Sequence, residues 1–413
     1  MTSFNRISVI GLGYIGLPTA AVFANQGVEV TGIDSNPEVV ASINAGRPHF
    51  GEPNLDALVR RVVENGKLRA AAEVPAAEAF LVAVPTPLRD GGHADMSYVR
   101  AAAEAIAPVL VVGNLVILES TSPVGSTEQL ARWLAELRPD LGFPMDQGEL
   151  ADINVAHCPE RVLPGRIIDE VVNNARVIGG MTRKCAQRAL SLYRIVVQGD
   201  CRVTNARTAE LAKLSENAYR DVNIAFANEL SLICDRHKIN VWELVEMANL
   251  HPRVEILSPG PGVGGHCIAV DPWFIVDGAP DDAKLIRMAR EINDAKPDFV
   301  CQKVAERAKS LVEPVIACLG LSYKADVDDL RESPAVEIVG KLADMAVAEL
   351  LIVEPHISSL PAELADRGLS LTDFDRALDK ANLVLLLVDH NAFMRVDRDL
   401  LKDKFVIDTR GAW

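Results

Sequence analysis

One cysteine of the chain has a sequence environment suited to chemistry. Cys267 follows GPGVGG (residues 260–265), in which five of six residues are glycine or proline, and Asp271 lies four residues further on. The glycines, Gly264 among them, expose backbone N–H groups without side chains, so we expect a bulky polar ligand to press against this main chain. An inert thiol in an apolar core is the alternative. The glycine loop and the adjacent His266, whose own role stays open, favour a reactive thiol whose thiolate a nearby cation would stabilise.

Lys213 is the candidate for that cation. It belongs to a stretch (residues 204–237) with neither glycine nor proline, which predicts one long helix of about 50 Å. On such a helix Lys213, Asn217 and Arg220 share one face, because they are four and three residues apart. Periodicity alone favours a solvated stripe. A neighbouring site would reverse that preference.

A nucleotide-binding motif opens the chain. GLGYIG (residues 11–16) has the pattern G-x-G-x-x-G between a predicted strand and a predicted helix. Gly11, Gly13 and Gly16 permit a tight turn and let the backbone approach a pyrophosphate at the helix N-terminus. Asp34 follows Gly16 by 18 residues at the end of a second predicted strand, where a carboxylate can bind ribose hydroxyls and would repel a 2′-phosphate. The motif therefore predicts NAD and not NADP; a tight turn without a ligand is the alternative.

A thiol and a bound NAD together indicate a two-stage oxidation. Oxidation of an alcohol to an aldehyde requires a hydride acceptor and a base. Cysteine can then add to the aldehyde, the thiohemiacetal can be oxidised to a thioester, and water can release the carboxylate. This chemistry would explain the bare backbone before Cys267 as room for a substrate carbon between the thiolate and the nicotinamide.

Two later strand ends carry threonines that could contact a ligand. VPTP (84–87) and ESTSPVGST (119–127) lie at the ends of apolar runs, and ligands of a doubly wound sheet bind beyond the carboxyl ends of its strands. Thr86, Thr121 and Thr127 are therefore placed to contact a cofactor or substrate. Each is equally typical of a helix cap or a turn.

The last part of the chain contains a further group of cations. GLSYKADVDDLRESP (320–334) follows a predicted strand and precedes a predicted helix, but it lacks G-x-G-x-x-G. Lys324 and Arg331 in this segment, and Arg410 at the end of the last predicted strand, could bind phosphate. Surface ion pairs with the neighbouring aspartates are the alternative.

The elements that must position these residues fall into three stretches. Short apolar strand patterns alternate with helical patterns at both ends of the chain, which predicts an α/β fold with two Rossmann-like, doubly wound domains. A central helical domain with one long helix, capped by Thr204 or Asn205, joins them. We expect an N-terminal dinucleotide-binding domain (1–202), a central domain with the catalytic loop (203–312) and a C-terminal Rossmann-like domain (313–413).

Composition bounds the class of function. The formal net charge of −15 argues against a partner nucleic acid. No apolar run approaches the roughly 18 residues of a membrane span, and the N-terminus lacks the pattern of a signal peptide, so we expect a cytoplasmic protein with no membrane partner. The seven cysteines show no Cys-x-x-Cys spacing, so we expect reduced thiols and no metal site.

The chain resembles one known family over its whole length, the UDP-glucose/GDP-mannose (nucleotide-sugar 6-) dehydrogenases. The resemblance lies in VIGLGYIGLPTA, AVPTP, ESTSPVGST, CPERVLPG, AELAKLSENAYRDVNIAFANEL, GPGVGGHCIAVDPWF and SYKADVDDLRESP, in this order. Within the family, the last three motifs are most similar to those of members that act on UDP-N-acetyl-D-mannosamine. UDP-glucose enzymes typically carry an aromatic residue and a lysine where this chain has Ile268, Ala269 and Val270.

This resemblance implies a four-electron oxidation of a UDP-sugar, with two NAD reduced per sugar, in the synthesis of a surface polysaccharide. It also implies a C-terminal domain that binds the UDP-sugar and a homodimer built around the long helix. UDP-N-acetyl-D-mannosamine is the expected substrate, and UDP-N-acetylglucosamine and UDP-glucose are the alternatives.

The resemblance further implies roles for particular residues. Cys267 is the nucleophile, Lys213 is the acid/base and oxyanion-stabilising lysine, and Asn217 shares the oxyanion role. Asp271, Thr121 and Glu160 arrange the water and the proton transfers. Contacts with NAD are implied, besides the three glycines of residues 11–16, for Tyr14, Ile15, Asp34, Thr86, Thr127 and Arg331. Contacts with the substrate, some of them across a dimer interface, are implied for Arg161, Val162, Lys213, Asn217, Arg220, His251, Arg253, Gly264, Lys324 and Arg410.

Two other classes of function stay open on the sequence. A two-electron dehydrogenase of small hydroxy acids would share the first domain and a helical domain with a lysine, but it would need no thiol. A non-catalytic nucleotide-sugar sensor would bind both ligands without producing NADH. The presence of both Lys213 and Cys267 favours an enzyme.

Overall fold

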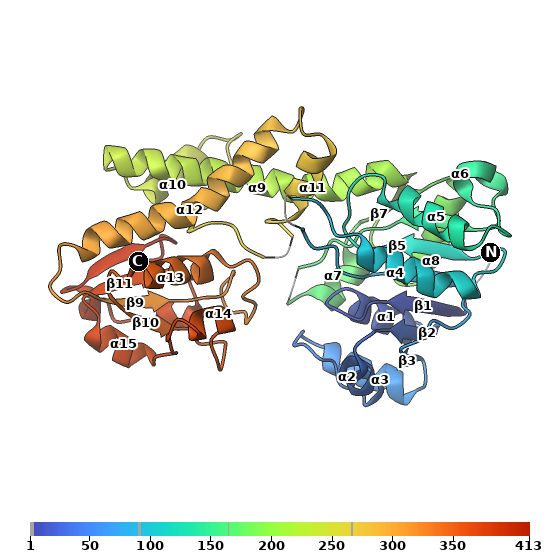
Figure 1. The fold of residues 1–413 in the computed structure, drawn as a ribbon, viewed down its shortest axis with the longest axis horizontal. Coiled ribbons are helices and arrows are strands. Elements are labelled where there is room, and N and C mark those ends of the chain that lie inside the picture. The colour runs from blue at the N-terminus through green and yellow to red at the C-terminus, as the bar shows by residue number, and fades with distance from the viewer. Residues whose placement is uncertain (1–3, 90–91, 164, 266) are drawn as a thin grey trace. The chain divides into compact units, whose positions relative to one another are not determined.

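The computed structural model describes residues 4–89, 92–163, 165–265 and 267–413. The chain forms two compact units, Met1–Glu216 and Asn217–Trp413 (Figure 1). Each unit contains its own α/β sheet, so the predicted fold class is confirmed. Among the described helices, none combines the length and apolar composition that a membrane crossing requires.

In the described part of the first unit, eight strands form one sheet in the order β3-β2-β1-β4-β5-β6-β7-β8. The strands are β1 (Arg6–Ile10), β2 (Glu29–Ile33), β3 (Leu68–Ala71), β4 (Ala79–Val82), β5 (Leu115–Leu118), β6 (Asn154–His157), β7 (Arg176–Gly180) and β8 (Cys201–Asn205). Neighbouring strands are parallel except β6 and β7. The strand order reverses between β1 and β4, which is where a doubly wound sheet opens a crevice for a ligand.

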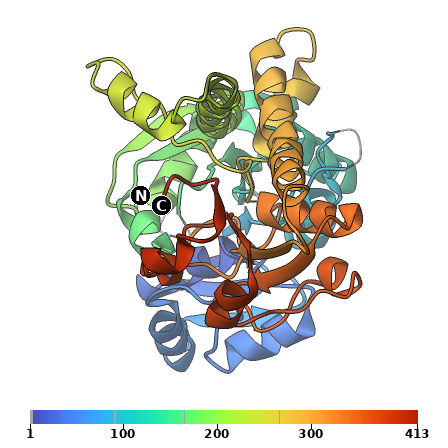
Figure 2. The ribbon, with the colours of Figure 1, turned by 90° about the vertical axis from the view of Figure 1, so that its left-hand side faces the viewer.

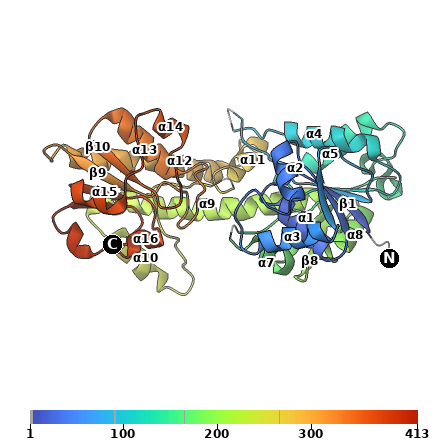
Figure 3. The same ribbon diagram turned by 90° about the horizontal axis from the view of Figure 1, so that it is seen from below.

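Helices cover both faces of this sheet, and β4 shows why. Ala79 and Leu81 point into one apolar core and Phe80 and Val82 into another, as a continuous apolar run in a parallel sheet requires. The helices are α1 (Gly16–Asn25), α2 (Pro37–Asn44), α3 (Leu55–Glu64), α4 (Ser97–Ile106), α5 (Ser126–Leu137), α6 (Pro144–Gln147), α7 (Ile167–Asn173) and α8 (Arg183–Tyr193). Helices α1, α3, α7 and α8 pack on the first core, and α4 and α5 pack on the second (Figure 3).

The predicted long helix is α9 (Ala206–His237), which has 32 residues. It begins directly after β8, and the Asn205 side chain accepts a hydrogen bond from the Thr208 amide at 2.8 Å. This bond satisfies one of the free N–H groups at the helix start, so the predicted asparagine cap is confirmed. The boundary between the two units falls within α9.

In the described part of the second unit, four parallel strands form a sheet in the order β10-β9-β11-β12 (Figure 2). They are β9 (Val315–Leu319), β10 (Glu349–Val353), β11 (Leu383–Leu386) and β12 (Phe405–Asp408). The helices are α10 (Val241–Asn249), α11 (Asp271–Gly278), α12 (Lys284–Ala308), α13 (Pro334–Met345), α14 (Ala362–Ala365), α15 (Phe374–Lys380) and α16 (Asn391–Met394). Residues of α12 and α13 form the core on one face, and residues of α15 and α16 form it on the other.

Candidate active site

The turn between β1 and α1 has the geometry of a pyrophosphate cradle. Gly11 has φ +90°, and a Cβ there would lie 2.5 Å from the Ala83 carbonyl oxygen. A Cβ on Gly13, by contrast, would meet no described atom within 4 Å, so this position opens on space that a ligand can use. Among the described residues, no side chain caps the start of α1. Its first N–H groups can therefore bind an anion.

Asp34 follows β2 and faces this turn. Its carboxylate accepts the N–H of Leu12 at 3.1 Å and that of Asn36 at 2.9 Å. A carboxylate offers about four acceptor sites, so Asp34 retains capacity for ribose hydroxyls. Beside it, the Tyr14 ring stacks on Phe50 with centroids 4.3 Å apart. The turn, the uncapped helix and the acid together fit NAD.

The threonines beyond β4 and β5 bond within the protein. Thr86 donates from Oγ1 to the carbonyl oxygen of Thr121 at 2.6 Å. Thr127 is fully buried, and its hydroxyl donates to Glu210 of α9 at 2.6 Å. The Glu210 carboxylate also accepts the N–H groups of Gly125 and Thr127, and burial raises its pKa. Thr86 and Thr127 therefore bond within the protein, and their contact with NAD stays a prediction.

Lys213 and Glu160 form a buried ion pair in the first unit. Lys213 Nζ lies 3.3 Å from Glu160 Oε1, and both side chains are less than a tenth exposed. The second oxygen of Glu160 accepts the N–H of Val162 at 2.7 Å, which fixes the carboxylate. An ammonium and a carboxylate held this way can exchange a proton with each other or with a bound hydroxyl.

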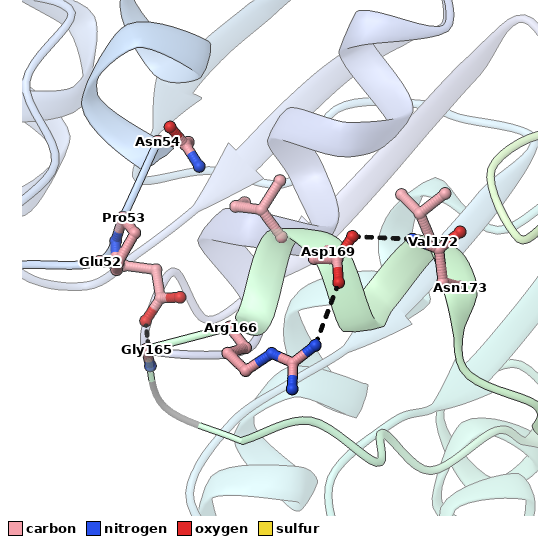
Figure 4. Close-up of a pocket in the computed structure, with 9 residues that line it drawn as sticks. Glu52, Pro53, Asn54, Gly165, Arg166, Asp169, Val172 and Asn173 are labelled. Carbon is pink, nitrogen blue, oxygen red and sulfur yellow. Dashed lines mark hydrogen bonds and ion pairs between the residues drawn. The ribbon is translucent and has the colours of Figure 1, made fainter.

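The loop after β6 is held in place by two acidic residues. Arg161 on this loop forms an ion pair with Glu216 of α9. Glu52, from the segment before α3, accepts the N–H groups of Gly165 and Ile167, each at 2.8 Å, and so caps α7. Figure 4 shows Glu52 reaching Gly165 beside a cavity of about 370 Å³ between α7 and the segment before α3. Glu52 and Gly165, which hold the loop after β6 in place, are among the residues that line this cavity.

Cys267 lies in the second unit, where it is exposed and lies four residues before the start of α11. Its carbonyl oxygen accepts the N–H of Asp271, the first residue of α11, at 2.9 Å. Asn217 of α9 donates from Nδ2 to Asp271 Oδ2 at 2.5 Å, and both residues are buried. The structure thus brings together Asn217, Asp271 and the backbone of Cys267. His266 lies outside the described residues.

The glycines before Cys267 pack against the segment that follows β9. The N–H of Gly265 donates to the carbonyl oxygen of Arg331 at 3.2 Å. A Cβ on Gly264 would lie 2.5 Å from the carbonyl oxygen of Glu332. From the sequence we expected this bare backbone to face a ligand. The structure gives a different reason for the two glycines, because a side chain on Gly264 would collide with the backbone of Glu332 and one on Gly265 with the ring of Tyr323.

The predicted cations of the second unit fall into two groups. Arg331 bonds Asp329, with Nη2 to Oδ2 at 2.6 Å, and Arg410 Nε bonds Asp389 Oδ1 at 2.9 Å. The Arg331–Asp329 pair is one of the ion pairs that the sequence left open, whereas Asp389 lies outside that segment; the ligand contacts of both arginines stay predictions. The remaining predicted substrate contacts of this unit are exposed side chains: Arg220, His251, Arg253 and Lys324.

Sequence reasoning missed three carboxylates that hold loops in place. Glu354 directly follows β10 as Asp34 directly follows β2, and this equivalent position was an available signal. Glu210 precedes Lys213 by three residues on the predicted helix, so it lies one turn away on the same side. For Glu52 we find no sequence signal, since its partner Gly165 is 113 residues away.

Comparison with known proteins places these residues in context. The UDP-glucose/GDP-mannose dehydrogenase family matches in three parts, with its NAD binding domain at residues 5–197, its central domain at 207–295 and its UDP binding domain at 317–413. An NDP-N-acetyl-D-galactosaminuronic acid dehydrogenase of Ralstonia nicotianae is 60% identical over 410 residues, covering 99% of this chain and 96% of that protein. A UDP-N-acetyl-D-mannosamine dehydrogenase of Campylobacter jejuni is 57% identical over 401 residues, covering 97% and 98%. The solved structure of a UDP-D-ManNAc dehydrogenase from Pyrococcus horikoshii has a TM-score of 0.89 and 40% identity, covering 99% of this chain and 96% of that one.

Proposed function

We propose that this chain, which belongs to the UDP-glucose/GDP-mannose dehydrogenase family, oxidises the C6 alcohol of UDP-N-acetyl-D-mannosamine to the carboxylate, for a surface polysaccharide. Family membership makes it an NAD-dependent UDP-sugar dehydrogenase. The observation that carries the choice of sugar is full-length similarity, at 55–57% identity, to proteins named UDP-N-acetyl-D-mannosamine dehydrogenase. The proposal includes three domains, at residues 1–202, 203–312 and 313–413.

The first oxidation uses groups of the first unit. The glycine turn and Asp34 would hold one NAD for each oxidation in turn, and each NAD would supply a two-electron acceptor when bound. In our proposal the Glu160 carboxylate takes the proton of the C6 hydroxyl, and the Lys213 ammonium paired with it acts as the acid that stabilises the resulting alkoxide. Thr121 orients the hydroxyl from the end of β5.

The second oxidation uses Cys267. Its thiolate adds to the C6 aldehyde to form a C–S bond, and Lys213 and Asn217 stabilise the alkoxide oxygen of the thiohemiacetal. Loss of two electrons and the C6 hydrogen gives a thioester. Water oriented by Asp271 then adds to the thioester carbonyl, the C–S bond breaks, and the carboxylate and the thiol are released.

We propose a homodimer built around α9. Three apolar side chains on this helix, Tyr219, Phe226 and Ile233, recur every seven residues and are 70%, 51% and 48% exposed. An exposed apolar stripe at this spacing is typical of a helix–helix interface. Light scattering of wild type and Phe226→Glu tests this part of the proposal; a monomeric wild type would contradict it.

We also propose that the protein acts in the cytoplasm. All seven cysteines are free thiols, which a reducing compartment maintains.

A comparison of kcat/KM across UDP-sugars tests the substrate. We expect UDP-N-acetyl-D-mannosamine to exceed UDP-glucose and UDP-N-acetylglucosamine. UDP-N-acetylgalactosamine is the second candidate, because the relative with 60% identity is named for the galactosaminuronic acid. A higher kcat/KM for the galactosamine sugar would replace our assignment with that one. No NADH with any of these sugars would contradict the proposed enzyme.

A further inference from the structure

A buried acid–histidine pair lies at the carboxyl ends of β10 and β11, outside the groups assigned to catalysis. Glu354 directly follows β10, and His390 follows β11 by four residues. Both side chains are fully buried, and His390 Nε2 lies 3.0 Å from Glu354 Oε2. Burial of such groups is unfavourable unless their donors and acceptors are satisfied.

Hydrogen-bond donors occupy the acceptor sites of the Glu354 carboxylate, and two of these donors are backbone N–H groups of the segment after β9. Its Oε2 accepts the N–H of Leu321 at 2.7 Å and that of Ser322 at 3.1 Å, besides the bond from His390. Its Oε1 accepts the N–H of His356 at 3.0 Å. A carboxylate has about four acceptor sites, so these donors occupy them. Glu354 therefore holds backbone, where the equivalent Asp34 keeps capacity for a ribose.

His390 holds the same segment at a second point. Its Nδ1 accepts the N–H of Asp326 at 2.9 Å, so the proton of the neutral ring lies on Nε2, which donates to Glu354. The Asp326 carboxylate in turn accepts the N–H of Asn391 at 3.0 Å. Residues 321–326 are thus tied to the ends of both β10 and β11.

The side chains around His390 have the composition of a metal site. Donor atoms of Asp326, His356 and His390 lie within 4.8 Å of one another. However, the Nδ1 lone pair of His390 is directed at the Asp326 N–H, and Oδ1 of Asp326 accepts from Asn391. A metal ion would have to displace both bonds. The geometry favours an anchor for the loop.

The anchored segment supports two functional elements of the second unit. Lys324 lies within it, and further along the Arg331 carbonyl oxygen accepts the N–H of Gly265. A Cβ on Gly265 would lie 2.9 Å from the ring of Tyr323, so the glycine loop rests on this segment. Cys267 follows two residues later. The anchor therefore sets the place of the lysine and of the loop that carries the thiol.

We propose that Glu354 and His390 are positioning residues for the nucleotide half of the site. They hold residues 321–332 in the conformation that presents Lys324 to the UDP group and supports the glycine loop. The inference rests on the proposed function and deepens it. In this inference the second sheet binds the nucleotide without using Glu354, the acid that follows β10, to hold the ribose.

Calorimetric titration of UDP into His390→Phe tests the inference. We expect the Kd for UDP, and the KM for the UDP-sugar, to rise about tenfold, the size of one charge-assisted hydrogen bond. We expect kcat to change by less than about threefold, because the lost interactions act through substrate binding. The Kd for NAD should rise by much less than the Kd for UDP, since the glycine turn and Asp34 lie in the first unit and only Arg331 of the anchored segment is expected to contact NAD. His356→Gln is the comparison variant: it removes a ring whose centroid lies 4.8 Å from that of His390 but keeps the backbone bond to Glu354, so the Kd for UDP should rise less than in His390→Phe.

Two conservative variants keep the test open if His390→Phe does not fold. His390→Asn keeps an acceptor near the position of Nδ1, and His390→Gln keeps a donor near the position of Nε2. Each should retain part of the UDP affinity that removal of the ring abolishes. Wild-type UDP affinity in every folded His390 variant would overturn the inference. A wild-type protein that binds UDP but oxidises no UDP-sugar would overturn the proposed function instead, and the UDP titrations would still decide the role of the anchor.

Discussion

The two units begin their sheets with the same backbone turn. In the first unit Gly11 follows β1 with φ +90°, and its N–H bonds the carbonyl oxygen of Ile33 at 2.8 Å. In the second unit Gly320 follows β9 with φ +93°, and its N–H bonds the carbonyl oxygen of Val353 at 2.8 Å. Only glycine adopts such φ values without strain. The two turns are therefore one structural solution used twice.

The turns differ in what their polar groups hold. Asp34 accepts one N–H of its own turn, whereas Glu354 accepts two and a histidine as well. Among the described residues, no side chain caps α1, whereas Ser333 caps α13 by accepting the N–H of Ala335. In the first unit, donors and acceptors of the turn after β1 can still bind a ligand. In the second unit, the corresponding groups bond the protein's own segment after β9. A strand-end acid thus indicates a ribose site only where it retains acceptor capacity.

Of the variants that test this comparison of the two turns, Gly13→Ala should have the largest effect on ligand affinity. The new Cβ meets no described atom of the protein, but it occupies the space of the pyrophosphate. We expect the Kd for NAD to rise about a hundredfold, equivalent to about 2.7 kcal/mol. The Tm should change by less than about 2 °C. Calorimetry measures both quantities.

The control is Gly278→Ala, at a second glycine whose Cβ would meet no described atom. It should leave both NAD affinity and Tm unchanged. Equal loss of NAD affinity in the two variants, or unfolding of Gly13→Ala, would show that Gly13 does not face the cofactor.

Asp34→Ala should have a smaller effect on the cofactor. Loss of one charge-assisted hydrogen bond should raise the KM for NAD about tenfold. The preference for NAD over NADP should also fall, because the repulsion of the 2′-phosphate is removed. Steady-state rates with both cofactors measure this, with Glu38→Ala on α2 as an exposed carboxylate control. A wild-type protein that uses NADP as well as NAD would break the argument for Asp34.

Glu354→Gln should affect stability and its pH dependence. Burial alone would raise the pKa of Glu354, but hydrogen bonds from His390 and from the Leu321 and His356 amides hold it below its usual value. A carboxyl with a lowered folded pKa stabilises the protein above its unfolded pKa and loses this contribution as the pH falls through the folded pKa. We expect the variant to lose about 1 kcal/mol of unfolding free energy at pH 7.

Urea unfolding between pH 7 and pH 3 measures this prediction. The difference between wild type and Glu354→Gln should shrink as the pH falls from the ordinary pKa of a glutamate, about 4.3, through the lower pKa of folded Glu354. A constant difference at all pH values would contradict the role given to the ionised carboxylate.

The sequence predicted the elements because their signals are local. The absence of glycine and proline over residues 204–237 located α9 to within two residues of its observed bounds, Ala206–His237. Apolar runs located β1, β2, β4 and β5 of the first sheet and β9 to β12 of the second, but not β3, β6, β7 or β8. The contacts between loops depend on chain topology and carry no local signal. Lys213 meets Glu160, 53 residues earlier, and the glycine run before Cys267 predicted bare backbone but not the segment that packs on it.

The yield of NADH from limiting UDP-N-acetyl-D-mannosamine, with wild type and Cys267→Ala side by side, tests the central claim most directly. Our account predicts two NADH and one uronic acid per sugar for wild type. It predicts that Cys267→Ala forms the uronic acid at least about a thousandfold more slowly, because the nucleophile is absent. One NADH per sugar in both proteins would contradict the thioester route and leave an alcohol dehydrogenase in which Cys267 takes no part.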